Sequence, residues 1–267
     1  MPPRAALLAA LNAGVRAAAP SDALARHLPP RPRGRVLALA LGKASVPMAR
    51  ALHAAWGAPD AGLIITPHGT GAAIPGFRVM EAAHPVPDAH SEAAGGAALR
   101  LAAHAGAGET LVVLLSGGGS ALACAPLGVT LAEKAETTRA LLACGAGIHD
   151  VNTVRRHLSA LKGGGVLRAA HPQARVVTYA LSDVVGDDPA TIAGGPTVPP
   201  PTAPGDALTV LDRYGLALPR ARGAARPRGA APPQPERRVP RDRQWPPRTR
   251  RRRARPRGRR VRRARLA

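Results

Sequence analysis

Residues 111–120 read LVVLLSGGGS, an apolar run followed at once by three glycines between two serines. Five consecutive aliphatic residues without polar alternation predict a strand that is buried on both faces of a sheet. The same character is found in Val36–Leu41 (VLALAL), Leu63–Thr66 (LIIT) and Val176–Leu181 (VVTYAL), and more weakly in Phe77–Met80 (FRVM). Strands of this kind belong to parallel sheets that helices cover on both sides.

Helical patterns separate these runs. They predict a first helix over residues 88–104, with Asp88 as its N-cap. A second helix is predicted from the Thr130–Glu133 capping box to about Cys144. A third is predicted to be capped by Asp150 and to run through Leu161, where Gly163, Gly164 and Gly165 end it. Strands that alternate with helices predict a three-layer α/β/α domain with a mainly parallel, Rossmann-like sheet over residues 1–219.

The positive charge is concentrated at the end of the chain. Overall, 38 Lys+Arg outnumber 16 Asp+Glu and give a net charge of +22. Residues 220–267 hold 20 arginines and two acids, so this segment carries +18 and residues 1–219 carry only +4. The segment has few large apolar side chains to offset the entropy cost of ordering, and we expect it to be disordered.

Three interpretations of residues 220–267 stay open. They could form a basic arm that binds nucleic acid non-specifically through its phosphates, or a solvated low-complexity extension. They could also result from reading a GC-rich gene out of frame, since Arg, Pro, Ala and Gly, whose codons are built on G and C, make up 39 of the 48 residues. We expect the third, in which this tail replaces a C-terminal domain.

The remaining composition excludes several classes of protein. Cys124 and Cys144 form no CxxC pair, which argues against a disulfide scaffold or a zinc module and fits a reducing cytoplasm. No apolar run reaches the roughly 18 residues that a membrane span needs, so we expect no membrane association. The oligomeric state stays open, a homo-oligomer included. An amphipathic first helix, rather than a cleaved signal peptide, is predicted by the shared face of Leu7, Leu8, Leu11 and Val15.

The candidate site residues follow the carboxyl ends of the predicted strands, where open α/β sheets bind ligands. The first group is a turn whose backbone N–H groups, at the start of a helix, could cradle a phosphate or a carboxylate: Ser116, Gly117, Gly118, Gly119 and Ser120. The alternative is a tight strand–helix turn without a ligand. The pattern is not GxGxxG, because Leu122 occupies the last glycine position.

Lys43 follows Gly42 at the end of the first strand, without the glycine spacing of a P-loop. A lysine in this position is often a solvated surface group. However, the chain has only three lysines, Lys43, Lys134 and Lys162, beside 35 arginines. A lysine kept in such a composition indicates a need for a compact point charge.

Carboxylates and further cations complete the candidate set. Asp183, Asp187 and Asp188 follow the strand at 176–181 and can hold Mg²⁺, accept a hydroxyl proton or simply cap a turn. The predicted helix at 150–162 carries Asn152, Arg155, Arg156, His157 and Lys162, of which the first three are spaced to converge on one anion or to form a solvated face. Cations, backbone donors and carboxylates around one crevice indicate phosphoryl transfer.

Four stretches resemble the type-2 glycerate kinase family, whose MOFRL-type enzymes are also called hydroxypyruvate reductases. They are HPVPDAHSEAA (84–94), LLSGGGSALACAP (114–126), VNTVRRHLSALKGGGVL (151–167) and SDVVGDDPATIAGGPTVP (182–199). The resemblance covers residues 5–219 and is to the larger, N-terminal domain of that family. It implies an α/β/α domain with an active site facing a smaller second domain, for which the arginine-rich tail is no match.

The resemblance also implies an activity and roles for the candidate residues. The family phosphorylates glycerate at its 2-hydroxyl with ATP and Mg²⁺, and Lys43 corresponds to its active-site lysine. The expected roles are catalysis for Lys43 and Asp183, phosphate or nucleotide binding for residues 116–120, glycerate binding for Asn152, Arg155 and Lys162, and Mg²⁺ binding for Asp187 and Asp188. His84 could equally be a structural hydrogen bonder.

Two other functions make different predictions. An oxidoreductase that acts on hydroxypyruvate requires a dinucleotide fingerprint with an acidic residue about 20 positions further on, and the sequence contains none. A nucleic-acid-binding protein acting through its tail would lose affinity steeply with salt, and the tail offers only Trp245 for stacking on bases.

Overall fold

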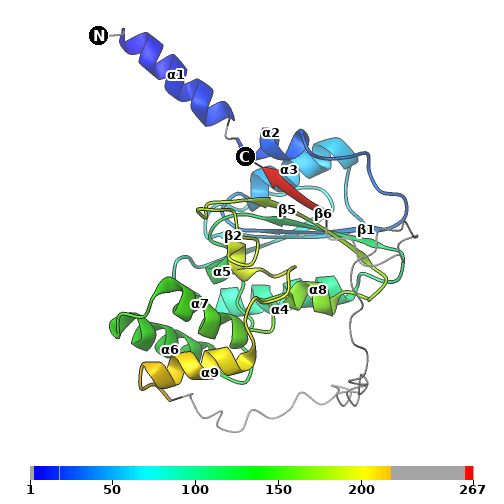
Figure 1. Ribbon diagram of the computed structural model, residues 1–267. Helices are drawn as coiled ribbons and strands as arrows, with labels where there is room; N and C mark the ends of the chain where they lie inside the picture. The colour runs from blue at the N-terminus through cyan, green and yellow to red at the C-terminus, as the bar shows by residue number, and fades with distance from the viewer. Residues whose placement is uncertain (1–2, 18, 218–261, 267) are drawn as a thin grey trace, which may run out of the picture.

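A computed structural model describes residues 3–17, 19–217 and the backbone of 262–266. Its centre is a parallel sheet in the order β3-β2-β1-β4-β5-β6 (Figure 1). The strands are β1 (Val36–Leu41), β2 (Ala61–Pro67), β3 (Phe77–Ala82), β4 (Thr110–Leu115), β5 (Arg175–Leu181) and β6 (Arg262–Leu266). All five predicted strands and their parallel pairing are confirmed.

Helices connect the strands and cover both faces of the sheet (Figure 1). They are α1 (Arg4–Ala17), α2 (Pro20–Ala25), α3 (Ser45–Trp56), α4 (Ala89–Ala103), α5 (Gly119–Leu122), α6 (Leu131–Ala143), α7 (Ile148–His157), α8 (Gly165–Ala169), the 3-10 turn η1 (Ile192–Gly194) and α9 (Pro204–Arg213).

Alternate residues of each central strand enter two separate cores. On β1, Leu39 packs in a cluster with Ala98 of α4, whereas its neighbour Ala40 packs with Met48 of α3 on the opposite face. Both positions are fully buried, as are all residues of β1 and β4. The period-2 geometry of a strand sends neighbouring side chains to opposite faces, so a strand between two helical layers needs apolar residues throughout. The predicted three-layer α/β/α fold is therefore confirmed.

A third cluster joins α6, α7 and α9 below the sheet in Figure 1. Leu141, Val154 and Leu211 are buried in it, one from each helix. This packing holds α6 and α7 beside the carboxyl edge of the sheet. Those two helices bring Lys134 and Arg155 to that edge.

Two predicted helix starts are confirmed and the third is wrong. Asp88 and Thr130 cap α4 and α6, each within a reciprocal capping box. Asp150 does not cap α7, which begins at Ile148 after Gly147. The Asp150 carboxylate instead accepts hydrogen bonds of 3.0 Å from both Arg213 and Tyr214, so a contact with α9 displaced the expected cap.

The end of α7 also differs from the prediction. The helix stops at His157, and Ser159 enters an isolated antiparallel bridge with Pro126. Lys162 therefore lies beyond α7 rather than on it. Gly164 has a φ of 83° and precedes α8, so the glycine run opens the next helix instead of closing α7.

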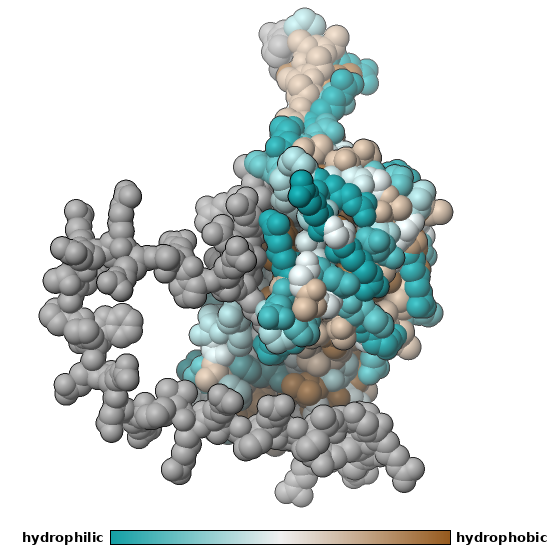
Figure 2. All heavy atoms as spheres, turned by 90° about the vertical axis from the view of Figure 1, so that its right-hand side faces the viewer, coloured by the Kyte–Doolittle hydropathy of each residue, from teal (hydrophilic) through white to brown (hydrophobic). Residues whose placement is uncertain are grey.

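The predicted N-terminal helix forms, but its apolar face packs on nothing among the described residues. No residue of α1 is buried, and the exposed fractions of Leu7, Leu8, Leu11 and Val15 are 58, 48, 62 and 63%. In Figures 1 and 2 the helix stands clear of the body of the molecule. Across the described residues, no helix combines the length and the apolar character that crossing a bilayer requires.

The predicted tail lies almost entirely outside the described residues. The continuous description ends at residue 217, close to the expected domain end at Pro219. Within the tail, for which the sequence predicts no ordered element, the backbone of 262–266 pairs in parallel with β5 as β6. An edge strand such as β5 leaves a row of backbone groups open to such pairing.

Candidate functional site

The strand order places a switch point between β1 and β4, the neighbours at the centre of the sheet. Ligands of doubly wound sheets bind at this point, beyond the carboxyl ends of the strands. The two turns that leave it are joined by hydrogen bonds. The Lys43 amide donates to the carbonyl of Gly117 at 2.9 Å, and the Ala44 amide donates to the Ser116 hydroxyl at 3.0 Å.

Gly42 makes this junction sterically feasible. Its φ of 127° is accessible mainly to glycine, and a Cβ there would lie 2.5 Å from the Ser116 carbonyl oxygen. The fold therefore requires a glycine directly before Lys43. The close contact of Gly42 with Ser116 fixes the position of the Lys43 backbone.

The glycine turn brings Lys43 and Asp183 together, as the resemblance implies. A Cβ on Gly117 would collide with the Asp183 carboxylate, so this carboxylate lies directly on the turn. A Cβ on Gly118 would lie 3.1 Å from the Lys43 stem and 3.1 Å from the His84 ring. Three side chains from three different loops thus meet over two glycines.

His84 belongs to this group, a role that the sequence left undecided. Burial, followed by the positive charge of Lys43, lowers the pKa of His84, and the Asp183 carboxylate partly opposes that shift. The surroundings of the His84 ring, between a cation and an anion, therefore favour its neutral form on balance.

The last residue of the turn, Ser120, is held by two of the predicted substrate-binding residues. The Lys162 ammonium donates to the Ser120 hydroxyl at 2.7 Å and to its carbonyl at 2.9 Å. The Arg155 guanidinium reaches the same hydroxyl at 3.2 Å and contacts the amide oxygen of Asn152 at 3.4 Å. Lys162 is 2% exposed, and its stem lies against Gly194 of η1.

A third cation, Lys134 of α6, joins this cluster and is not among the predicted site residues. Its side chain is buried, and its ammonium has no conventional hydrogen-bond partner within the described residues. The thiol of Cys124, a weak acceptor, lies beside it. Lys134, Arg155 and Lys162 are called the cation cluster below.

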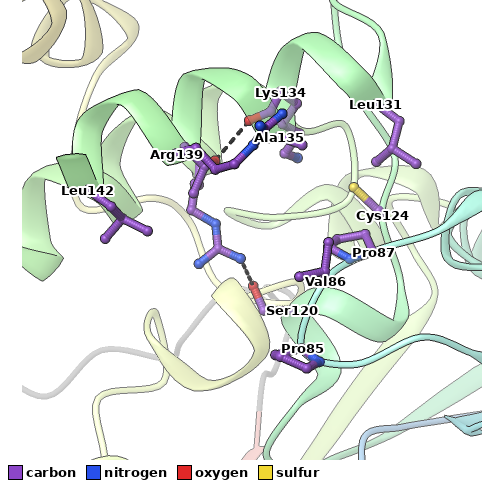
Figure 3. Close-up of a pocket in the computed structure, with 12 residues that line it drawn as sticks. Pro85, Val86, Pro87, Ser120, Cys124, Leu131, Lys134, Ala135, Arg139 and Leu142 are labelled. Atoms are coloured by element: carbon purple, nitrogen blue, oxygen red, sulfur yellow. Dashed lines mark hydrogen bonds between the residues drawn. The ribbon is translucent and has the colours of Figure 1, made fainter.

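Two members of the cation cluster, Lys134 and Arg155, line a pocket of about 290 Å³. The Pro85–Pro87 segment supplies one apolar wall. The polar lining comes from Ser120, Cys124, Lys134, Thr138, Arg139 and Arg155. Figure 3 shows α6 running along this pocket with Lys134, Leu131 and Leu142, and the Pro85–Pro87 segment across from it. The pocket is of the size that holds a small ligand.

Electrostatics in the cluster are unbalanced. Burial, then repulsion from Lys134 and Arg155, holds the pKa of Lys162 well below its usual value. Burial is also the largest cause that lowers the pKa of Lys134 and of Arg155. Within the described residues, the only group that raises these pKa values is the Cys124 thiol; no carboxylate acts on any of the three. Buried charges are normally paired, so this arrangement favours an anionic ligand.

The acidic residues after β5 do not gather into one metal site. Asp188 accepts hydrogen bonds from the Ala190 amide and the Thr191 hydroxyl at the start of η1, which is the turn-capping alternative. Asp187 occupies a left-handed turn position with a φ of 52°. Asp183 is exposed and accepts no hydrogen bond within the described residues. Of the three, Asp183 has the carboxylate that a ligand at the glycine turn can reach.

The predicted convergence on α7 is only partial. Asn152 and Arg155 contact each other and face Ser120. Arg156 is buried and attracted by Asp188 instead, and its Nη1 has no partner within the described residues. Arg156 therefore does not join Asn152 and Arg155 at Ser120.

The described residues contain one group of three potential metal ligands, and the sequence does not predict it. It comprises His68, Asp88 and His90, whose ligand atoms lie within 4.8 Å of one another. This group is separate from the acidic loop and lies where β2 and β3 lead into the next elements.

Comparison with known proteins identifies the family of this chain. A family model described as "Domain of unknown function (DUF4147)" matches residues 6–224. The chain belongs to the DUF4147 family. This domain is found with the MOFRL domain, so the resemblance to the type-2 glycerate kinase family is confirmed.

Relatives of this DUF4147 chain carry two kinds of name. A protein of Agrobacterium vitis named "Putative hydroxypyruvate reductase" is 44% identical over 225 residues, which cover 84% of this chain and 51% of that protein. The D-glycerate 2-kinase of Thermotoga maritima is 40% identical over 205 residues, covering 76% of this chain and 49% of that one. The chain thus spans about half the length of the curated relatives it matches.

A solved structure is similar to this DUF4147 chain in fold. The crystal structure of glycerate kinase from Thermotoga maritima superposes with a TM-score of 0.75 at 39% identity, over 79% of this chain and 51% of that chain. The α/β fold of the DUF4147 domain is therefore that of a glycerate kinase structure.

Proposed function

We propose that this chain takes part in the ATP-dependent phosphorylation of glycerate at its 2-hydroxyl group, which gives 2-phosphoglycerate. The observation that carries the proposal is the cation cluster beside the glycine turn, because it lacks a counter-charge within the described residues. Relatives named as glycerate kinases at 40–51% identity support the same substrate.

The cation cluster suits a small carboxylate. A carboxylate in the pocket can accept from the Lys134 ammonium, which lacks a conventional partner, and from the Arg155 guanidinium. It would raise the lowered pKa values of these groups and so recover part of the free energy that burying them costs. Glycerate carries one such carboxylate next to its 2-hydroxyl, and the pocket volume of about 290 Å³ accommodates a three-carbon acid.

The junction of Lys43, His84 and Asp183 suits the transfer step. The Lys43 ammonium would stabilise charge on the moving phosphoryl group, and the amides of Gly117 and Gly118, which donate to no acceptor within the described residues, would bind its oxygens. The bond from the terminal phosphorus of ATP to the bridging oxygen breaks as the bond to the 2-oxygen forms. Asp183 would accept the hydroxyl proton.

The residues present fit Mg²⁺ in a limited way. Mg²⁺ in phosphoryl transfer is commonly held by one or two carboxylates together with phosphates and water. The exposed Asp187 carboxylate meets that need, and Asp183 could add the oxygen that does not face the hydroxyl group. Asp188 already accepts two hydrogen bonds. When bound, Mg²⁺ would neutralise charge that develops on the phosphate oxygens.

Reduction of hydroxypyruvate is the second candidate, because two relatives from Agrobacterium vitis bear the name of that activity. The β1–α3 turn, where a dinucleotide would bind in this strand order, reads Gly42-Lys43-Ala44-Ser45 and lacks the GxGxxG fingerprint. NAD(P)H consumption with hydroxypyruvate as substrate separates the two reactions directly.

The test measures binding and turnover separately. Calorimetry with D-glycerate reports binding by this chain, and chromatography of a mixture with MgATP reports ADP and 2-phosphoglycerate. Lys43→Met should abolish product, whereas Arg50→Met, an exposed change on α3, should not. Absence of glycerate binding would contradict the proposed substrate, and full activity of Lys43→Met would contradict the role of the lysine.

A further inference from the structure

His68, Asp88 and His90 meet at the carboxyl edge of the sheet, outside the cation cluster. His68 follows β2, Asp88 ends the loop from β3 and caps α4, and His90 lies in the first turn of α4. The two rings stand edge to face, with their centroids 5.3 Å apart. A segment after β2 and one after β3 are thus brought together by three side chains that can ligate a metal.

The two oxygens of Asp88 have different partners. Oδ1 accepts from the Ser91 amide at 2.8 Å, the Ser91 hydroxyl at 2.9 Å and the Ala83 amide at 3.4 Å. Oδ2 lies 3.1 Å from Nε2 of His68 and 3.2 Å from Nδ1 of His90. The helix cap therefore orients the carboxylate, and the second oxygen is directed between the two imidazoles.

These separations are close to those around a bound ion. Two ligand atoms about 2.0–2.1 Å from a tetrahedral zinc ion lie about 3.3 Å from each other. The two Asp88–His distances are 3.1 and 3.2 Å, and the two nitrogens are no more than 4.8 Å apart. The His90 side chain is 71% exposed, so its ring can turn to shorten the remaining distance.

We propose that His68, Asp88 and His90 form a binding site for a divalent transition metal of the zinc class. Two imidazoles and one carboxylate favour such ions over Mg²⁺, which prefers oxygen ligands. Three protein ligands at an exposed position leave room for water in the coordination shell. The site is independent of the Mg²⁺ expected for phosphoryl transfer, because it shares no ligand with Asp183 or Asp187.

Metal binding would tie the turn after β2 to the loop between β3 and α4. That loop contains the Pro85–Pro87 segment, which forms a wall of the pocket. A bound ion would therefore make the chain more resistant to unfolding and would fix one wall of the pocket.

The experiment titrates Co²⁺ into the tag-free chain and follows its visible absorption, with Zn²⁺ added afterwards as competitor. Wild-type chain should bind one equivalent, Zn²⁺ should displace it and millimolar Mg²⁺ should not. His68→Ala and His90→Ala should each weaken binding by at least about tenfold, since each removes a direct ligand. His104→Ala, an exposed histidine at the end of the same helix α4, is the matched control and should bind as wild type.

Two results would overturn the proposal. The first is that His68→Ala and His90→Ala bind Co²⁺ as tightly as His104→Ala. The second is that Mg²⁺ displaces Co²⁺ from the wild-type chain. Circular dichroism of each metal-free variant establishes that it is folded, so loss of binding is distinguished from loss of structure.

Discussion

The Lys162 ammonium lies 2.7 Å from the hydroxyl oxygen of Ser120, although the two residues are 42 positions apart in the sequence. The lysine is almost completely buried, and both of its acceptors belong to neutral groups of Ser120. A buried ammonium with only neutral acceptors keeps much of its desolvation cost. This contact orients the end of the glycine turn and leaves the positive charge available to a ligand.

Replacing Lys162 should weaken the binding of anions without unfolding the chain. We expect Lys162→Met to reduce the affinity for glycerate at least about tenfold, equivalent to about 1.4 kcal/mol. The thermal midpoint should stay the same or rise, because an uncompensated buried charge is removed and the methionine fills the space. Calorimetry and thermal unfolding measure the two effects.

Arg139→Met is the matched control, since Arg139 is an exposed cation that lines the pocket beside the cation cluster. It should change the affinity much less than Lys162→Met. A Lys162→Met chain that melts far lower and keeps full affinity would show that the lysine serves only the fold.

Substituting Gly42 should destabilise the chain strongly. Gly42→Ala places a Cβ 2.5 Å from the Ser116 carbonyl oxygen at a φ of 127°, so we expect a loss of more than about 3 kcal/mol. Gly34→Ala also introduces a side chain at positive φ, 82°, but meets no atom within 4 Å, and should cost only about 1 kcal/mol. Urea unfolding of both variants separates the cost of backbone strain from the cost of the collision with Ser116. If both variants lose the same free energy of unfolding, Ser116 moves aside without cost.

The free energy of unfolding should depend on pH in a way that reflects the lowered pKa of Lys162 in the cation cluster. The pKa of Lys162 is lower in the folded chain than in the unfolded chain, where a lysine keeps its proton up to about pH 10.4. Between the two pKa values, the unfolded chain therefore binds one proton that the folded chain has lost. The free energy of unfolding should therefore rise with pH in this window, relative to Lys162→Met. Anion binding should weaken over the same window. Denaturant titrations at several pH values test this; identical slopes in the two chains would contradict it.

Removing α1 should leave the fold intact. None of its residues is buried, so deletion of residues 1–17 should change the free energy of unfolding by less than about 0.5 kcal/mol. Leu24 of α2, which is fully buried, provides the contrast, and Leu24→Ala should cost about 2–5 kcal/mol. A deletion that costs as much as Leu24→Ala would show that the helix packs on the domain in solution.

The sheet could be predicted because its signal is local. Runs such as 36–41 and 111–115 are apolar at every position, and only a strand covered on both faces requires that. The N-cap roles of Asp88 and Thr130 could be predicted for the same reason, since a capping box lies within four consecutive residues. Asp150 looked the same in the sequence, but its carboxylate is satisfied by α9, more than 60 residues away.

The candidate residues that follow strand ends were the simplest to predict, because the carboxyl ends of parallel strands meet at one edge of the sheet. Lys43, the glycine turn and Asp183 fall there, and the fold brings them into contact. Lys134 and the His68–Asp88–His90 group depend on how helices and loops pack, which no local pattern encodes. One signal could have found Lys134: the chain has three lysines among 35 arginines, and all three border the glycine turn or the adjoining pocket.

Among the residues that the structure describes, no carboxylate balances the cation cluster, and this has a practical consequence for experiments on the protein. A folded chain that lacks a counterion will take one from its solvent, and sulfate or phosphate in a storage buffer would raise its melting temperature by mass action. The same ions would compete with an added carboxylic acid and make its affinity look weaker. Measurements made in chloride and in phosphate therefore compare two different ligation states of the protein.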